Sequence, residues 1–227
     1  MGSIAQQSPV PRGGASLIVA WSIASRHILV VGGSDAAASR VFFALEADAQ
    51  VHVVAPKTSL SPALIGHIDR REVTYYDREF EQRDLHDKSM VFVASEDASL
   101  AKHIAALCRM GRIPVNIADQ PDLSDFWLTS TYRDHALQIA VSTNGNGPKI
   151  ATRLRKHIAA TLPEGSGLAI QRLGVLRQKL RAADPSDKSA SRRLAFINKL
   201  SEAWPLQKLA ELTNGEIDQL VQIYLAG

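Results

Sequence analysis

Residues 27–37 read HILVVGGSDAA, and this stretch decides the fold. The apolar run 28–31 is typical of a buried strand in a parallel sheet. Gly32 and Gly33 then turn the chain into a helix expected over residues 35–46. A strand, a glycine turn and a helix in this order resemble the opening of a dinucleotide-binding domain.

The same alternation of strand and helix continues along the chain. Further buried strands are expected at residues 51–55, 73–76, 90–94 and 113–118. The first helix should bury Val41, Phe42 and Leu45, and a helix over residues 95–110 should end with Gly111 as its C-cap. This pattern predicts an α/β fold with a Rossmann-like, doubly wound parallel sheet.

The pattern changes after residue 119. Two strands, 126–132 and 137–142, are separated by only four residues, which predicts a hairpin outside the parallel sheet. An exposed hairpin with an apolar face favours self-association. Helices follow at residues 149–162, 168–183, 188–203, 205–212 and 215–225. We therefore expect a flexible tail (1–16), a dinucleotide-binding domain (17–119), a dimerisation segment (120–163) and a small C-terminal helical domain (164–227).

The composition is that of a globular protein. The 227 residues are 45% hydrophobic and 22% charged. The single cysteine, Cys108, excludes an intrachain disulfide and a zinc ribbon, and we expect it to pack on a helix in a protein of a reducing compartment, the cytoplasm. No apolar run approaches the ~20 residues of a membrane helix. Residues 17–24 resemble a signal-peptide core, but packing against the nucleotide domain is the preferred interpretation.

The net charge of +3 hides an asymmetry. Residues 149–208 contain 13 Lys and Arg but four Asp and Glu, a net charge of +9, whereas the remainder carries −6. A basic region on an acidic protein favours an anionic partner, either nucleic acid or a small polycarboxylate. A solvated helical surface is the alternative. No aromatic interleaving or nucleic-acid motif accompanies the charge, so we do not expect a nucleic-acid partner.

The glycine turn departs from the dinucleotide fingerprint at one position. Gly32 and Ala37 fit its outer positions, but Ser34 replaces the middle glycine. The hydroxymethyl group of Ser34 either crowds a pyrophosphate or donates a hydrogen bond to it, and the helix N-terminus attracts phosphate in both cases. The cofactor-binding residues predicted here are Gly32, Gly33, Ser34, Asp35 and Ala36.

The choice between NAD and NADP is left open by the end of the second strand. An acidic residue that binds the adenosine ribose is expected there, but the chain reads Ala55-Pro56-Lys57-Thr58-Ser59. Lys57 would favour a 2′-phosphate, whereas the hydroxyls after it would bond a free ribose. Ala55, Pro56 and Lys57 complete the predicted cofactor site, with Lys57 as plain surface the alternative.

Two further features suggest chemistry. Asp119 directly follows the expected strand 113–118, and ligands of parallel sheets lie beyond the carboxyl ends of strands, so Asp119 would transfer protons beside the nucleotide. A turn carboxylate is the alternative. The loop 142–148 leads into a helix that carries Arg153, an arrangement that suits an anion or a simple capped turn. No His, Cys or Glu cluster has the spacing of a metal site.

Several segments together resemble the siroheme synthase family, especially its fungal members. They are residues 14–21 (GASLIVAW), 28–33 (ILVVGG), 51–56 (VHVVAP), 114–119 (PVNIAD) and 138–145 (QIAVSTNG), with Pro148 after them. The resemblance is good over residues 13–163 and looser in the helical C-terminus. The segment Val115 to Asp119 and the Ser142-Thr143 loop are specific, whereas the glycine turn is not.

This resemblance implies a precorrin-2 dehydrogenase that uses NAD and also acts as a sirohydrochlorin ferrochelatase, with Fe²⁺ as a substrate. It implies a homodimer and a tetrapyrrole substrate whose carboxylates suit the basic region. The essential aspartate of the family matches Asp119, the predicted catalytic base. The predicted substrate-binding residues are Asn116, Ser142, Thr143, Asn144, Gly145 and Arg153.

A different class of protein remains as the alternative. A dinucleotide-sensing regulatory protein would keep the fold and the dimer without catalysis. Such a protein would bind NAD but leave the absorption of a tetrapyrrole unchanged.

Overall fold

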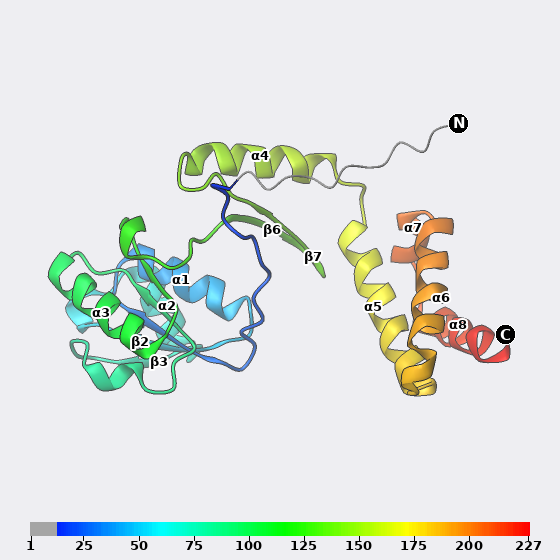
Figure 1. Cartoon of the computed structure of the whole chain (residues 1–227), viewed down its shortest axis with the longest axis horizontal. Helices are drawn as coiled ribbons and strands as arrows, with labels where there is room; N and C mark the ends of the chain where they lie inside the picture. Colours follow the sequence, from blue (N-terminus) through cyan, green and yellow to red (C-terminus); the bar gives the residue numbers. More distant parts are fainter. Residues whose placement is uncertain (1–12) are drawn as a thin grey trace. The chain divides into compact units, whose positions relative to one another are not determined.

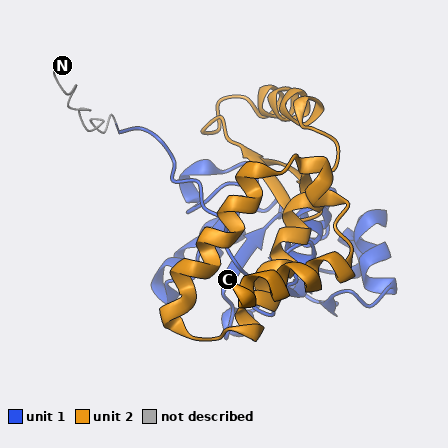
Figure 2. Cartoon of the chain, turned by 90° about the vertical axis from the view of Figure 1, so that its right-hand side faces the viewer, with its two compact units in different colours: residues 1–128 blue, residues 129–227 orange. Residues whose placement is uncertain are grey.

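The structure is a computed structural model that describes residues 13–227. The chain forms two compact units, residues 1–128 and 129–227, each of which we describe by itself (Figure 2). Most of the expected N-terminal tail, residues 1–12, lies outside the described residues.

The first unit is built on a five-stranded parallel sheet with the order β3-β2-β1-β4-β5 (Figure 1). Its strands are β1 (His27–Val31), β2 (Gln50–Val54), β3 (Thr74–Tyr76), β4 (Met90–Val93) and β5 (Val115–Ile117). The chain runs outward from β1 to β3 and then crosses back to β4 on the other side of β1. The carboxyl ends of β1 and β4 therefore flank the topological switch point, where open α/β sheets bind ligands. The predicted α/β fold class is confirmed.

Helices cover both faces of this sheet. The helices α1 (Asp35–Leu45) and α2 (Pro62–Asp69) pack on one face, and α3 (Ala98–Gly111) packs on the other. Short 3-10 turns lie at η1 (Lys57–Ser59), η2 (Gln82–Leu85) and η3 (Pro121–Leu123). Alternate strand residues enter the two cores, so Val30 contributes to the α1 side and Leu29 to the α3 side.

Some local expectations are corrected. Phe42 is 50% exposed, because the buried face of α1 is formed by small residues and Val41. Gly111 is the last residue of α3 rather than its cap, and Arg112 takes the left-handed C-cap conformation. Cys108 is fully buried on α3, as expected, and burial raises the pKa of its thiol to about 12.

The segment 17–24 packs on the unit only in part. Leu17 is 88% exposed, and Ile18 and Val19 are exposed as well. Ile23 is buried in the core, and the Trp21 ring lies edge-on to Phe126 at 6.4 Å. The expected packing of residues 17–24 is therefore wrong for most of the segment, since all of these residues except Ile23 are exposed. None of the helices in residues 13–227 has the length and apolar character needed to cross a membrane.

The second unit begins with an antiparallel hairpin, β6 (Ser130–Asp134) and β7 (Leu137–Val141). The first strand starts four residues later than expected, because Phe126 packs on Phe92 and Asp125 donates its N–H to the Val115 carbonyl of the sheet edge (2.8 Å). The helix α4 (Pro148–Thr161) packs on the hairpin. The hairpin is also tied to the next helix, because the Gly167 N–H donates to Asp134 (2.9 Å).

Four helices complete the second unit. They are α5 (Ser166–Ala183), α6 (Ala190–Ala203), α7 (Leu206–Ala210) and α8 (Asn214–Ala226), with a 3-10 turn, η4 (Asp187–Ser189), before α6. Leu176, Leu180, Leu209 and Ile217 are fully or almost fully buried among them. This core explains why the helices stay together as one compact body.

Candidate functional site

The glycine turn after β1 lets three segments meet at the switch point. Gly32 has φ +117°, and a Cβ placed on it would lie 2.3 Å from the Ala94 carbonyl oxygen at the end of β4. A Cβ on Gly33 would lie 2.4 Å from the Ser59 carbonyl oxygen. Both contacts are with backbone atoms, so a side chain at either position would push the segments apart.

Ser34 is the N-cap of α1. Its Oγ accepts a hydrogen bond from the Ala37 N–H (3.4 Å) and donates one to the Ala94 carbonyl (3.4 Å). The Ser34 hydroxyl is thus used for hydrogen bonds within the protein. The first backbone N–H groups of α1 are those of Asp35 and Ala36. Such a helix start, next to a tight glycine turn at the switch point, suits a pyrophosphate. The residues therefore fit a dinucleotide.

The end of β2 meets an acidic residue that the sequence reasoning missed. Ala55 is buried, and its carbonyl accepts the Tyr75 hydroxyl (2.9 Å). The Lys57 N–H donates to Asp77 Oδ1 (2.7 Å), and Lys57 and Asp77 are both exposed. Burial and the Asp77 charge raise the pKa of Tyr75. The sequence contained a signal for this residue. Asp77 directly follows the expected third strand, and the carboxyl ends of parallel strands lie at the same edge of a sheet, so Asp77 could be expected near the end of the second strand.

Asp119 lies in the turn that follows β5. It is exposed and left-handed (φ +57°), and the turn is held to β4 because the Ala118 N–H donates to the Val93 carbonyl (2.8 Å). Aspartate tolerates this backbone region better than most residues. The carboxylate is therefore held at the carboxyl edge of the sheet, as the sequence predicted.

Arg40 on α1 is a second charged group near Asp119. Its Nη1 donates to the Ala36 carbonyl (3.2 Å), while its buried Nε has no hydrogen-bond partner among the residues described. Burial lowers the pKa of the Arg40 guanidinium, and the Asp119 charge opposes this shift. No sequence signal distinguished Arg40 from a solvated helix residue.

Asn116, predicted to bind substrate, is buried on β5. Its Nδ2 donates to the Phe126 carbonyl (2.9 Å), and its Oδ1 is buried with no partner in residues 13–227. This hydrogen bond helps fix the segment that runs along the edge of β5.

The other predicted substrate-binding residues belong to the second unit. The Ser142 Oγ accepts the Asn144 N–H (3.2 Å), and the Thr143 Oγ1 accepts the Gly147 N–H (3.2 Å). Asn144 and Gly145 are both left-handed and exposed. The two hydroxyls thus hold the loop before α4 in shape.

Arg153 is exposed in the second turn of α4, whereas Arg155 donates from Nε to Ser130 (3.1 Å) and braces α4 on the hairpin. Within the described part of the chain, no three His, Cys, Asp or Glu side chains group together as ligands of a metal ion.

The switch-point geometry defines the class of protein: an α/β protein with a dinucleotide-binding unit. Residues 19–130 match a family model described as putative NAD(P)-binding. Residues 134–161 match the sirohaem biosynthesis protein central model, and residues 163–227 match the sirohaem biosynthesis protein C-terminal model.

Relatives identify the family. The chain is 41% identical over 209 residues to the siroheme biosynthesis protein met8 of Schizosaccharomyces pombe, covering 92% of this chain and 79% of that one. The siroheme synthase of Thioalkalivibrio sulfidiphilus is 35% identical over 70% of this chain, which spans 32% of that longer protein. The chain belongs to the siroheme biosynthesis protein family and is a homologue of met8.

A solved structure has the same fold. The protein titled SirC, precorrin-2 dehydrogenase, superposes with a TM-score of 0.64, covers 93% of this chain and all of its own, and is 19% identical in sequence. This structure thus shares the architecture of our chain, in which a parallel sheet is followed by a hairpin with its helix and then by a helical C-terminus.

Proposed function

We propose that this protein oxidises precorrin-2 to sirohydrochlorin with NAD and then inserts Fe²⁺ to give siroheme. The observation that carries the proposal is the 41% identity to met8 across 92% of the chain. Fe²⁺ is here a substrate, so no resident metal site is required.

The dinucleotide would be held by the turn at the switch point. Gly32 and Gly33 allow its backbone to approach the pyrophosphate, and the N–H groups of Asp35 and Ala36 would bind it. Ser34 keeps the start of the helix in place. When bound, NAD supplies the acceptor for the hydride.

The cofactor is proposed to be NAD rather than NADP. The Asp77 carboxylate lies at the Lys57 N–H beyond the end of β2, where the adenosine ribose binds in this fold. One of its oxygens accepts the Lys57 N–H, and because the side chain is exposed, the carboxylate would also accept a ribose hydroxyl. A 2′-phosphate would meet the same negative charge and be repelled.

Asp119 is proposed as the base for the oxidation. Removal of two hydrogens from precorrin-2 releases one hydride and one proton, and the Asp119 carboxylate takes the proton. Its exposed side chain passes that proton to water between turnovers. The half-buried Arg40 places a positive charge near this carboxylate.

The same carboxylate serves metal insertion. Fe²⁺ replaces two pyrrole N–H protons of sirohydrochlorin, and Asp119 accepts these protons one after the other. Metal insertion needs no nicotinamide. It should therefore depend on Asp119 but not on the glycine turn.

In the second unit, Arg153 and the loop of Ser142, Thr143, Asn144 and Gly145 are proposed to bind carboxylates of the tetrapyrrole. In the first unit, Asn116 is proposed as a further substrate-binding residue. A homodimer through residues 120–163, in the cytoplasm, remains part of the proposal. The hairpin supports it, since exposed antiparallel strands favour pairing between copies.

The test is anaerobic absorption spectroscopy of purified protein with precorrin-2 and NAD. Asp119→Asn is the decisive variant, because asparagine tolerates the left-handed backbone and removes only the charge. Asp122→Asn, an exposed carboxylate in the neighbouring η3, is the matched control. Base catalysis is commonly worth about 10²–10⁴-fold, so Asp119→Asn should lose at least ~10²-fold in kcat while the control keeps its rate.

Two results would redirect the assignment. No conversion by a folded protein with either nicotinamide would refute the dehydrogenase, and iron insertion into supplied sirohydrochlorin would then test the chelatase alone. If the protein binds NAD but leaves the tetrapyrrole spectrum unchanged, its function would be that of a dinucleotide-sensing regulatory protein.

A further inference from the structure

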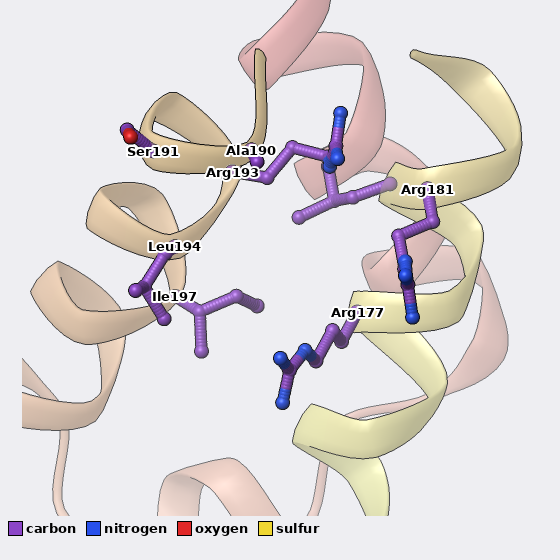
Figure 3. Close-up of a pocket in the computed structure, with 8 residues that line it drawn as sticks. Arg177, Arg181, Ala190, Ser191, Arg193, Leu194 and Ile197 are labelled. Atoms are coloured by element: carbon purple, nitrogen blue, oxygen red, sulfur yellow. The ribbon is translucent and has the colours of Figure 1, made fainter. Parts of the chain in front are cut away.

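The helical C-terminus contains a pocket that the proposed chemistry does not use. It has a volume of about 280 Å³ and lies between α5 and α6. Figure 3 shows Arg177 and Arg181 on α5 and the Arg193 side chain, which extends from α6 toward α5. Its eight lining residues are Arg177, Leu180, Arg181, Ala190, Ser191, Arg193, Leu194 and Ile197, none of them acidic.

Of the three arginines of this pocket, Arg193 interacts with a carboxylate, because its charge contributes to the lowered pKa of Asp184 after the hydrogen bonds from Tyr224 and Ser189. Arg193 is fixed by donating from Nη1 to the carbonyls of Asp184 (2.6 Å) and Ser186 (2.8 Å), which carry no net charge. The Asp184 carboxylate also accepts the Tyr224 hydroxyl (2.6 Å). The positive charge that the pocket offers to a ligand is therefore that of Arg177 and Arg181, since no acidic residue lines it.

The remaining lining is apolar. Leu180 is fully buried, and Leu194 and Ile197 lie along the α6 side. Guanidinium groups bind carboxylates in a two-point geometry that a lysine does not reproduce, whereas the aliphatic side chains suit hydrocarbon. The volume falls just below the roughly 300–1,000 Å³ of sites that enclose a drug-sized ligand. One arm of a larger molecule would fit, or one small acid.

We propose that this pocket binds a carboxylate carried on an apolar framework. Two sources share that chemistry. One is a carboxylated side chain of a tetrapyrrole, and this source rests on the proposed function. The other is a free aliphatic acid, which does not depend on it.

The test places a reporter in the pocket. Ser191→Cys supplies a reactive thiol there, and Cys108 is silent because it is fully buried. The rate of alkylation by a maleimide is measured with the full chain, with no cofactor present, against increasing uroporphyrin I or octanoate. Occupancy should protect the introduced thiol, and Arg177→Gln with Arg181→Gln should raise the half-protecting concentration about tenfold or more.

A matched control separates local binding from general attraction. Lys188→Gln with Lys199→Gln removes the same charge from exposed positions that do not line the pocket. Protection by uroporphyrin that depends only on the arginines supports the tetrapyrrole source. Protection by octanoate alone with that dependence supports the free acid.

Equal effects of both double variants, or no protection by either ligand, would overturn the proposal. Dehydrogenase activity is measured separately on each variant. An inactive protein whose pocket is still protected would refute the proposed function and leave the pocket assignment intact.

Discussion

Asp77→Asn tests the cofactor preference most directly. In the native protein the Lys57 N–H donates to Asp77 Oδ1 (2.7 Å). Asparagine keeps the shape of the side chain and an oxygen that can accept the same hydrogen bond. It removes only the negative charge beside the proposed ribose site. The expected change is therefore in the choice of nucleotide and not in the fold.

The size of the effect follows from exposure. A buried charge-assisted hydrogen bond contributes ~1.5–3 kcal/mol, but interactions of exposed charges are commonly worth no more than about 1 kcal/mol. Asp77 is exposed, so NAD should lose about 1 kcal/mol of binding, roughly fivefold. Relief of repulsion toward a 2′-phosphate should give NADP a similar gain, and the ratio of the two affinities should shift ~30-fold.

Isothermal titration with NAD⁺ and NADP⁺ at low salt measures both affinities without any tetrapyrrole. Asp69→Asn is the control, because Asp69 is an exposed carboxylate at the end of α2 that precedes β3, whereas Asp77 follows β3. An unchanged ratio in Asp77→Asn would refute the placement of the ribose. An equal shift in both variants would mean that the overall charge of the unit, and not Asp77, sets the preference.

Three other perturbations have defined outcomes. Gly32→Ala combines a left-handed φ of +117° with a 2.3 Å clash against backbone, so urea unfolding should show a loss of ~2–5 kcal/mol, and a loss under ~1 kcal/mol would contradict the packing. Arg40→Met should lower kcat, because it removes the positive charge near the proposed base, and an unchanged kcat would exclude this role. Glu72→Gln should lower the Tm at neutral pH, because hydrogen bonds from Arg70 hold the pKa of Glu72 at about 2 against an ordinary 4.5. That stabilisation is present above pH 4.5 and lost as the pH falls toward 2, so the difference in Tm should vanish on acidification, and a difference that persists at pH 2 would refute the attribution.

The sheet was predictable because buried strands and glycine turns have strong local signals. The run from Ile28 to Gly33 and the position of Asp119 follow from apolar periodicity and strand polarity alone. The start of the hairpin was not predictable in this way. Phenylalanine is common in strands, which is why Phe126 was expected to begin the hairpin. Its ring packs on Phe92 instead, and whether Phe126 joins the hairpin or packs on the sheet is decided by tertiary contacts.

The charged residues were harder to assign because chain order does not state which neighbour a side chain meets. The expected acid for the ribose was sought at the end of β2, yet Asp77 reaches the Lys57 N–H from the end of the neighbouring β3. Arg40 is half-buried by tertiary packing. The sequence shows only a charged residue in an amphipathic helix, which does not reveal this burial.

The same reasoning separates the two basic features of the second unit. A net charge of +9 over residues 149–208 predicts attraction to anions but no particular place for them. Arg155 and Arg193 bind Ser130 and backbone carbonyls, so part of that charge serves to hold the fold. Arg177 and Arg181, in contrast, line the pocket beside Leu180, and their exposed guanidinium groups can be reached by a ligand. Removing those two charges should therefore affect binding more than removing two lysines that do not line the pocket, whichever acid the pocket takes.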